Sequence, residues 1–140
     1  MIGAWKGVNE GVTNHIDNNP VEFSGRGPAM TLRANGRGRN YYGKHLVYRG
    51  GMVNGNRWTE VFHGYVTYDW QIQGRSMDLS DIKPHGTWEL LENGAYNNGG
   101  PLSLATGPGS FSCSGDTLRF YDNSGSTVLK RVLPKPQPGS

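Results

Sequence analysis

The stretch Trp70–Leu79, WQIQGRSMDL, aligns without a gap on Phe111–Phe120, FSCSGDTLRF. In both segments apolar residues occupy alternate positions on either side of a short turn, which contains Gly74 in the first copy and Gly115 in the second. Alternation with a period of two around a glycine-containing turn is typical of an antiparallel β-hairpin with one buried face. The two segments therefore predict the same hairpin twice.

The rest of the 140-residue chain continues this pattern of alternating segments between turns. Its 22 glycines and 8 prolines recur every few residues, which favours many short strands, and no stretch has the apolar spacing of a helix. Only 34% of the residues are hydrophobic, which suffices for a single sheet layer because a strand needs an apolar residue only at alternate positions. We predict an all-β protein, an eight- to nine-stranded antiparallel meander that closes into a barrel because closure removes exposed edges.

The organisation along the chain is predicted to be one domain at residues 1–133 and a Pro-rich, flexible tail at residues 134–140, which cannot pair in a sheet. Two segments rich in Asn and Gly, Asn9–Pro28 and Asn93–Gly100, are predicted to be long loops. If they lie at the open end of the barrel, they are its natural lids. The pair Gly50-Gly51 is expected to end a strand.

The net charge of +3 is scattered, and the main basic cluster is the segment Arg33–Arg39, which carries three arginines around an Asn-Gly turn. We interpret this segment as a solvated hairpin tip. An RNA-binding sheet would need aromatic residues interleaved with basic ones, a pattern that only Tyr41 and Tyr42 approach. A nucleic-acid partner is therefore not expected.

Cysteine, histidine and hydropathy patterns exclude several classes of site. Cys113 is the only cysteine, so the chain has no internal disulfide, and its place in the repeated hairpin predicts a small buried residue. No apolar run is long enough to span a membrane, and no signal peptide is recognised, because the first strand begins almost at Met1. We predict no cofactor. We also predict no metal site, because the four histidines contain no closely spaced ligand pair; they are His15, His45, His63 and His85.

The start of the first strand, Gly3-Ala4-Trp5, resembles the Gly-x-Trp of lipocalins and their calycin relatives. In that family the Trp closes one end of the barrel, and a basic residue late in the last strand packs across the indole. Arg131 or Lys130 stands at that place here, and a cation over an indole face combines cation–π attraction with burial of the aliphatic stem. The repeated hairpins are similar to those of small bacterial lipocalin-like domains, many of them secreted or lipid-anchored.

This resemblance implies a lipocalin-like barrel that binds a small hydrophobic or aromatic molecule. It also slightly favours a secreted or cell-envelope location, after removal of a leader, over a cytoplasmic one. Met30-Thr31-Leu32 followed by an Asn-Gly turn is similar to avidins, which are also calycins. The Ser and Tyr set that avidins use around biotin cannot be mapped onto this sequence, so biotin binding is not carried over.

A barrel of eight strands has room either for side chains that fill it or for one small ligand. Both outcomes stay open, because the inward positions include many large residues. Non-enzymatic binding of a small hydrophobic or aromatic molecule is our first hypothesis, and a filled barrel used for protein interactions is an alternative. The predicted walls of an aromatic pocket are Trp58, Phe62, Tyr68, Trp70, Trp88 and Phe111.

A further alternative is an isomerase or cyclase that acts on a hydrophobic substrate inside the barrel. Glu60 shares its strand face with the aromatic residues, whereas His63, Tyr65 and Asp69 occupy the other face under strict alternation. A His, a Tyr and an acid on one surface suit general acid–base catalysis. The competing interpretation of the same three residues is a solvated outer strand face.

Overall fold

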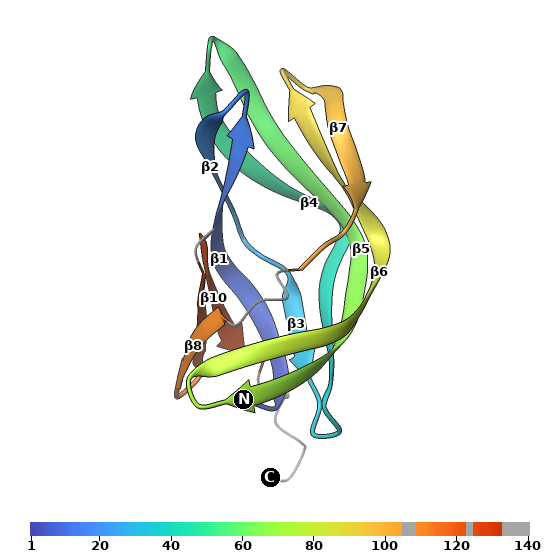
Figure 1. The fold of residues 1–140 in the computed structure, drawn as a ribbon, viewed down its shortest axis with the longest axis vertical. Helices are drawn as coiled ribbons and strands as arrows, with labels where there is room; N and C mark the ends of the chain where they lie inside the picture. The colour runs from blue at the N-terminus through green and yellow to red at the C-terminus, as the bar shows by residue number, and fades with distance from the viewer. Residues whose placement is uncertain (105–108, 123–124, 133–140) are drawn as a thin grey trace, which may run out of the picture.

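The computed structural model describes residues 1–104, 109–122 and 125–132, and these residues form ten β-strands in one antiparallel sheet (Figure 1). The all-β prediction is confirmed, with ten strands in this part of the chain instead of eight or nine. Residues 133–140, which include the predicted tail, lie outside the described residues. The strands are β1 Gly3–Ile16, β2 Asn19–Gly25, β3 Ala29–Leu32, β4 Arg37–Val53, β5 Asn56–Gln73, β6 Ser76–Glu92, β7 Ala95–Pro101, β8 Gly109–Ser114, β9 Thr117–Asp122 and β10 Gly125–Arg131.

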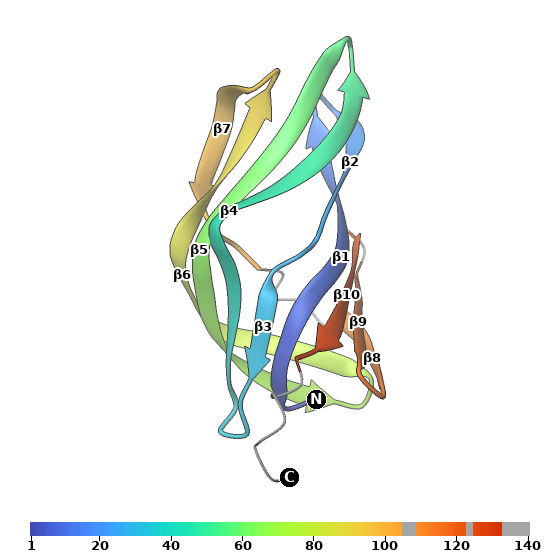
Figure 2. The ribbon, with the colours of Figure 1, turned by 180° about the vertical axis from the view of Figure 1, so that it is seen from behind.

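The strands are hydrogen-bonded in a ring. β1 pairs with β10, and the order then runs through β9, β8, β6, β5 and β4. β4 returns to β1 through two short strands, β2 and β3, each of which pairs with both (Figure 2). β7 lies off the ring and pairs with β6. No helix among the described residues is both long and apolar enough to cross a lipid bilayer.

The prediction of a long loop at Asn9–Pro28 is wrong, because most of this segment is the hairpin of β1 and β2. Its turn is formed by Asp17 and Asn18, both with positive φ (51° and 66°). Asp and Asn tolerate this left-handed conformation better than other non-glycine residues, so the polar composition marks a two-residue turn between strands. The alternation of Val21 and Phe23, both buried, is the strand signal within the segment.

The second predicted loop, Asn93–Gly100, is also paired. Asn93 and Gly94 form a turn with positive φ at both residues, and β7 then runs along β6. The expected break at Gly50-Gly51 is absent, because β4 continues to Val53. In each case Asn and Gly residues lie within strands, because strand pairing uses the backbone N–H and C=O groups that these residues also carry.

The repeated hairpin is confirmed in its pairing. Trp70 lies opposite Leu79 in β5–β6, and the equivalent residues Phe111 and Phe120 lie opposite each other in β8–β9. The glycine of each turn has a similar φ, 62° and 59°. The predicted burial of Cys113 is wrong, because its side chain is exposed. Its position next to the turn lies beyond the packed residues, as does the equivalent Ile72, which is 37% exposed.

A β-bulge decides which residues of β1 face the interior. Gly7 pairs with Leu129 and Asn9 with Val128, so Val8 is an extra residue that has no partner on β10. Before the bulge the buried residues of β1 have odd numbers, such as Trp5; after it the inward residues have even numbers, such as Glu10. One inserted residue therefore turns Glu10 toward the interior.

The interior contains two hydrophobic clusters, one toward each end of the long strands. The upper cluster lies toward the β1–β2 turn, which is near the top of Figure 1, and consists of Ile16, Val21, Phe23, Tyr42, Leu46, Tyr48, Trp58, Val66, Leu90 and Leu102. The lower cluster consists of Trp5, Met30, Leu32, Tyr68, Met77, Leu118 and Leu129. Trp5 is 1% exposed, and the guanidinium of Arg131 lies 4.3 Å from its ring centroid. Arg131, rather than Lys130, thus makes the predicted contact with the indole.

Two glycines allow β5 and β6 to approach closely midway along their length. Gly64 pairs with Gly86, and a Cβ at Gly64 would lie 2.2 Å from the carbonyl oxygen of His85. Gly64 also has a φ of 94°, which side chains other than glycine rarely adopt. The close approach lies within the part of β5 that carries the upper cluster, between Phe62 and Val66.

Candidate functional site

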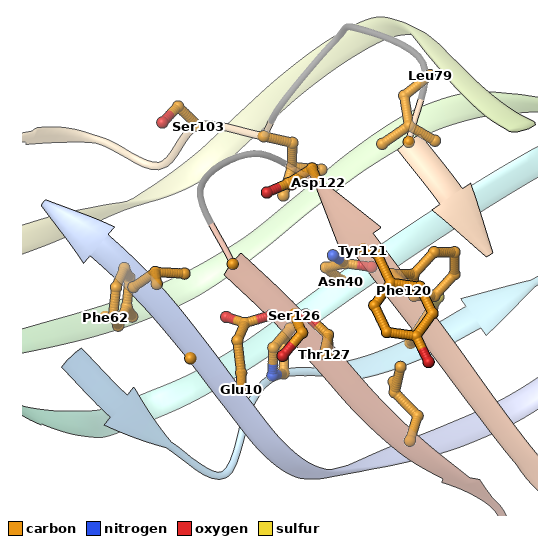
Figure 3. Close-up of a pocket in the computed structure, with 18 of the residues that line it drawn as sticks. Glu10, Asn40, Phe62, Leu79, Ser103, Phe120, Tyr121, Asp122, Ser126 and Thr127 are labelled. Carbon is orange, nitrogen blue, oxygen red and sulfur yellow. Dashed lines mark hydrogen bonds between the residues drawn. The ribbon is translucent and has the colours of Figure 1, made fainter. Parts of the chain in front are cut away.

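A cavity of about 380 Å³ lies between the upper and lower clusters and contacts members of both (Figure 3). Strands β1, β4, β5, β6, β9 and β10 all contribute to its lining. The polar and aromatic lining residues considered below are Glu10, Asn14, Asn40, Tyr42, Glu60, Phe62, Tyr68, Phe120 and Thr127. The cavity is therefore built from segments at both ends of the sequence.

Glu10 carries one of the two glutamate carboxyl groups in the wall, which Asp122 also lines. The Tyr48 hydroxyl donates a hydrogen bond of 2.5 Å to Oε1, and the Thr127 hydroxyl donates one of 2.5 Å to Oε2. Burial raises the pKa of Glu10, and the negative charge of Asp122 acts in the same direction, whereas the two hydrogen bonds act against it. In Figure 3, Glu10 lies beside Thr127.

Glu60 carries the second carboxyl group and is only 5% exposed. Asn14 donates a hydrogen bond of 3.3 Å from Nδ2 to its Oε1. Burial raises the pKa of Glu60, and the charge of Glu10 raises it further. Among the described residues, no lysine, arginine or histidine forms an ion pair with either glutamate. The cavity wall thus holds two acidic groups that lack a cationic partner within this part of the chain.

Three tyrosines around the cavity remain hydrogen-bond donors. Tyr68 donates a bond of 2.7 Å to Oδ1 of Asn40 inside the cavity wall. Burial raises the pKa of Tyr42, Tyr48 and Tyr68 above the usual range, and for Tyr42 and Tyr48 the charge of Glu10 adds to the effect. These phenols therefore stay protonated at neutral pH.

The apolar part of the wall is largely aromatic. Phe62 stacks on Tyr42 with ring centroids 5.4 Å apart and also contacts the ring of Tyr48 at 4.8 Å. Phe120 lines the cavity from β9, apart from Phe62 in the view of Figure 3. A flat or hydrophobic group placed here would contact ring faces, while its polar end would meet the carboxyl groups.

Two of the six predicted ligand-binding aromatics, Phe62 and Tyr68, line the cavity. Trp58 belongs to the upper cluster and Trp88 packs against it, whereas Trp70 and Phe111 pack against the lower cluster. These four do not contribute to the lining. The indole N–H of Trp58 is buried and has no hydrogen-bond partner among the described residues.

Of the four catalytic candidates from the sequence, only Glu60 lines the cavity. The His63 ring contacts the carbonyl oxygen of Lys44, and Tyr65 stacks on His85 with ring centroids 4.7 Å apart. Asp69 forms an ion pair of 2.6 Å with Arg37. The structure therefore does not bring His63, Tyr65 and Asp69 to the same site as Glu60.

Glu10 was missed by the sequence reasoning, which placed it in a loop. The available signal is that Trp5 lies at an odd position, whereas the later apolar residues of the strand, such as Val12 and Ile16, lie at even positions. Such a change indicates a bulge between them. In the part of the chain that the structure describes, no group of three or more His, Cys, Asp or Glu side chains is arranged to hold a metal ion.

Comparisons of the chain with protein-family models, with curated proteins and with solved structures find no match. The class of protein is therefore defined by the fold and the site alone. It is an all-β protein whose described strands form an antiparallel ring, with an aromatic cavity that is lined by two glutamates and an aspartate.

Proposed function

We propose that the protein binds a small aromatic or hydrophobic molecule in this cavity without changing it chemically, and that the polar end of this ligand is a protonated amine. The observation that carries the proposal is the pair Glu10 and Glu60, which share an aromatic cavity and form no ion pair with any described cation. The volume of about 380 Å³ falls within the range of about 300–1,000 Å³ for small-molecule sites.

An ammonium group suits this environment for two reasons. Its hydrogen bonds to carboxylates are charge-assisted and thus stronger than neutral ones. The faces of aromatic rings such as Phe62 and Phe120 also attract cations. A bound cation would favour the ionised forms of Glu10 and Glu60, so binding is expected to release protons at a pH where the free carboxyl groups are partly protonated.

We also propose that the ring of strands is a lipocalin-like, calycin barrel. The support is the hydrogen-bonded ring itself together with the contact between Arg131 and Trp5, which resembles the end-closing pair of that family. The secreted or cell-envelope location that this resemblance implies stays a prediction.

Isothermal titration calorimetry with three matched probes tests the proposed ligand class. Phenethylamine is expected to bind, phenethyl alcohol to bind more weakly, and hydrocinnamate not to bind, because the last brings a further negative charge to a cavity that carboxyl groups already line. Glu60→Gln should remove the preference for the amine over the alcohol. Glu22→Gln is the control, since it removes the same charge from an exposed position outside the lining.

Two results would contradict the proposal. One is equal affinity for the amine and the carboxylate. The other is the absence of a binding heat with all three probes, when circular dichroism shows that the protein is folded. Native mass spectrometry of the freshly purified protein provides a second measurement, because a co-purified amine would appear as a mass shift that is lost in Glu60→Gln.

Acid–base catalysis on a hydrophobic substrate is the second candidate function. The specific observation is that two carboxyl groups with raised pKa values share one cavity, as general acids and bases often do. Conversion of a co-purified molecule to a new product by the wild type, with binding but no conversion by Glu60→Gln, would favour this function over binding alone.

A further inference from the structure

A second hollow, of about 430 Å³, lies at the turn between β3 and β4. Its lining includes Thr31, Arg33, Asn35, Arg37, Arg39 and Thr67. Their strand neighbours Asn40 and Tyr68 line the inner cavity. Because successive side chains of a strand point to opposite faces, Arg39 and Thr67 lie on the outer face of the sheet.

The hollow has an excess of positive charge. Of its three arginines, Arg37 pairs with Asp69 at 2.6 Å and with Asp81 at 3.3 Å. Among the described residues, no carboxylate forms an ion pair with Arg33 or Arg39. Two guanidinium groups next to threonine hydroxyls are a donor set suited to phosphate oxygens.

The backbone that carries these arginines is held in place by Trp70. The indole N–H of Trp70 donates hydrogen bonds to the backbone carbonyl oxygens of Arg33, at 3.2 Å, and Arg37, at 3.0 Å. The backbone N–H of Trp70 donates a hydrogen bond of 2.9 Å to the carbonyl oxygen of Gly36. The turn is thus fixed to β5 at three points. Such preorganisation reduces the entropy lost when a ligand is bound.

A row of aromatic side chains crosses the same face of the sheet next to the hollow. Tyr41, Tyr65 and His85 are consecutive cross-strand partners on β4, β5 and β6. Tyr65 stacks on His85 at an interplanar angle of 17°, and Tyr41 is 46% exposed. The guanidinium of Arg39 lies 5.1 Å from the centroids of both tyrosine rings, so it connects the row to the hollow.

We propose that this outer face binds single-stranded nucleic acid. Arg33 and Arg39 hold backbone phosphates in the hollow, and Tyr41 and His85 provide surfaces on which bases stack. The alternation of basic and aromatic side chains that such a surface needs is present across strands, where the sequence alone does not show it. The site is independent of the proposed function of the inner cavity.

Fluorescence anisotropy with a labelled single-stranded oligonucleotide, in matched DNA and RNA forms, tests this proposal. Binding is expected at low salt and should weaken steeply between about 50 and 200 mM salt as counterions are released. The double variant Arg33→Gln/Arg39→Gln should reduce the slope of log affinity against log salt by about two, one for each phosphate contact. Tyr41→Ala should weaken binding about tenfold through lost stacking.

The matched control is Arg49→Gln/Arg57→Gln, which removes two charges from exposed positions of β4 and β5 outside the hollow and should retain binding. Thermal midpoints show whether each variant is folded. The proposal is overturned if no oligonucleotide binds at low salt or if duplex of the same sequence binds as well as the single strand. It is also overturned if Arg49→Gln/Arg57→Gln weakens binding as much as Arg33→Gln/Arg39→Gln does, or if Tyr41→Ala leaves the affinity unchanged. In either case, general attraction between the basic protein and a polyanion would account for the binding.

Discussion

Carboxyl groups on the inner face of the sheet and those on its outer face differ in burial and in ion pairing. On the inner face, Glu10 and Glu60 have no described cationic partner, and burial raises the pKa of each. On the outer face, Asp69 and Asp81 are nearly half exposed and pair with Arg37. The difference follows the surroundings of each carboxyl group, because the inner pair is desolvated by burial and the outer pair is solvated and paired with an arginine.

The largest expected effect comes from removing an interior side chain. Trp5→Ala should destabilise the protein by about 3–5 kcal/mol, because the indole is almost fully buried in the lower cluster and supports Arg131. Tyr96→Ala, which removes an aromatic ring that is 66% exposed, should change stability by less than about 0.5 kcal/mol. Urea denaturation measures both. An unchanged midpoint for Trp5→Ala would refute the end-closing role of Trp5.

Gly64→Ala is expected to have the next largest effect, because it changes the close approach of β5 and β6 beside the upper cluster. The added Cβ would meet the His85 carbonyl oxygen, and the residue has a positive φ, so a loss of about 2–3 kcal/mol is expected. Gly51→Ala is the control, since nothing lies within 4 Å of its Cβ position. Thermal unfolding of the two variants should separate them, and similar midpoints would show that β5 and β6 can move apart at this point.

The pH dependence of stability tests the inner carboxyl groups directly. Because the folded state raises the pKa of Glu10 and Glu60, it binds more protons than the unfolded state between their ordinary pKa, near 4.5, and the raised one. The contribution of these two carboxyl groups to the free energy of unfolding is fully present below the ordinary pKa, and it is lost as the pH rises through the raised pKa. The free energy of unfolding should therefore fall across this window toward neutral pH.

Glu60→Gln should flatten that decline, and it should be more stable than the wild type at about pH 8 because it removes a buried charge. Glu22→Gln, at an exposed position, should leave the profile unchanged. Denaturation at a series of pH values measures both. A profile for Glu60→Gln that is parallel to the wild type would mean that Glu60 is not desolvated in solution.

The smallest effect is expected on the outer face. Arg37→Gln breaks ion pairs that are largely solvent-exposed, so its thermal midpoint should stay close to that of the wild type and converge with it at high salt. A large loss of stability at every salt concentration would show that the outer face is not the solvated surface contrasted here with the cavity.

Much of the site on β5 follows from sequence alternation alone. Glu60, Phe62 and Tyr68 were assigned to one face of a single run, and all three line the cavity. The assignment succeeds because the pairing of β5 with β6 is regular from Trp58 to Thr67, and Tyr68 continues the alternation as the partner of Gly38 on β4. Alternation does not predict that Glu10 of β1 faces the cavity, because the bulge at Val8 changes which residues of the strand point inward.

The sequence by itself determined the local structure: an all-β chain, the repeated hairpin and the inward face of β5. These follow from alternation and turn residues, which act over a few positions. Only the tertiary structure decided that Asn9–Pro28 contains a hairpin, that Glu10 and Glu60 share a cavity, and that Arg39 connects an arginine hollow to an aromatic row. Bulges and cross-strand neighbours depend on which strand pairs with which and in what register, and this is set by the packing of residues far apart in the chain.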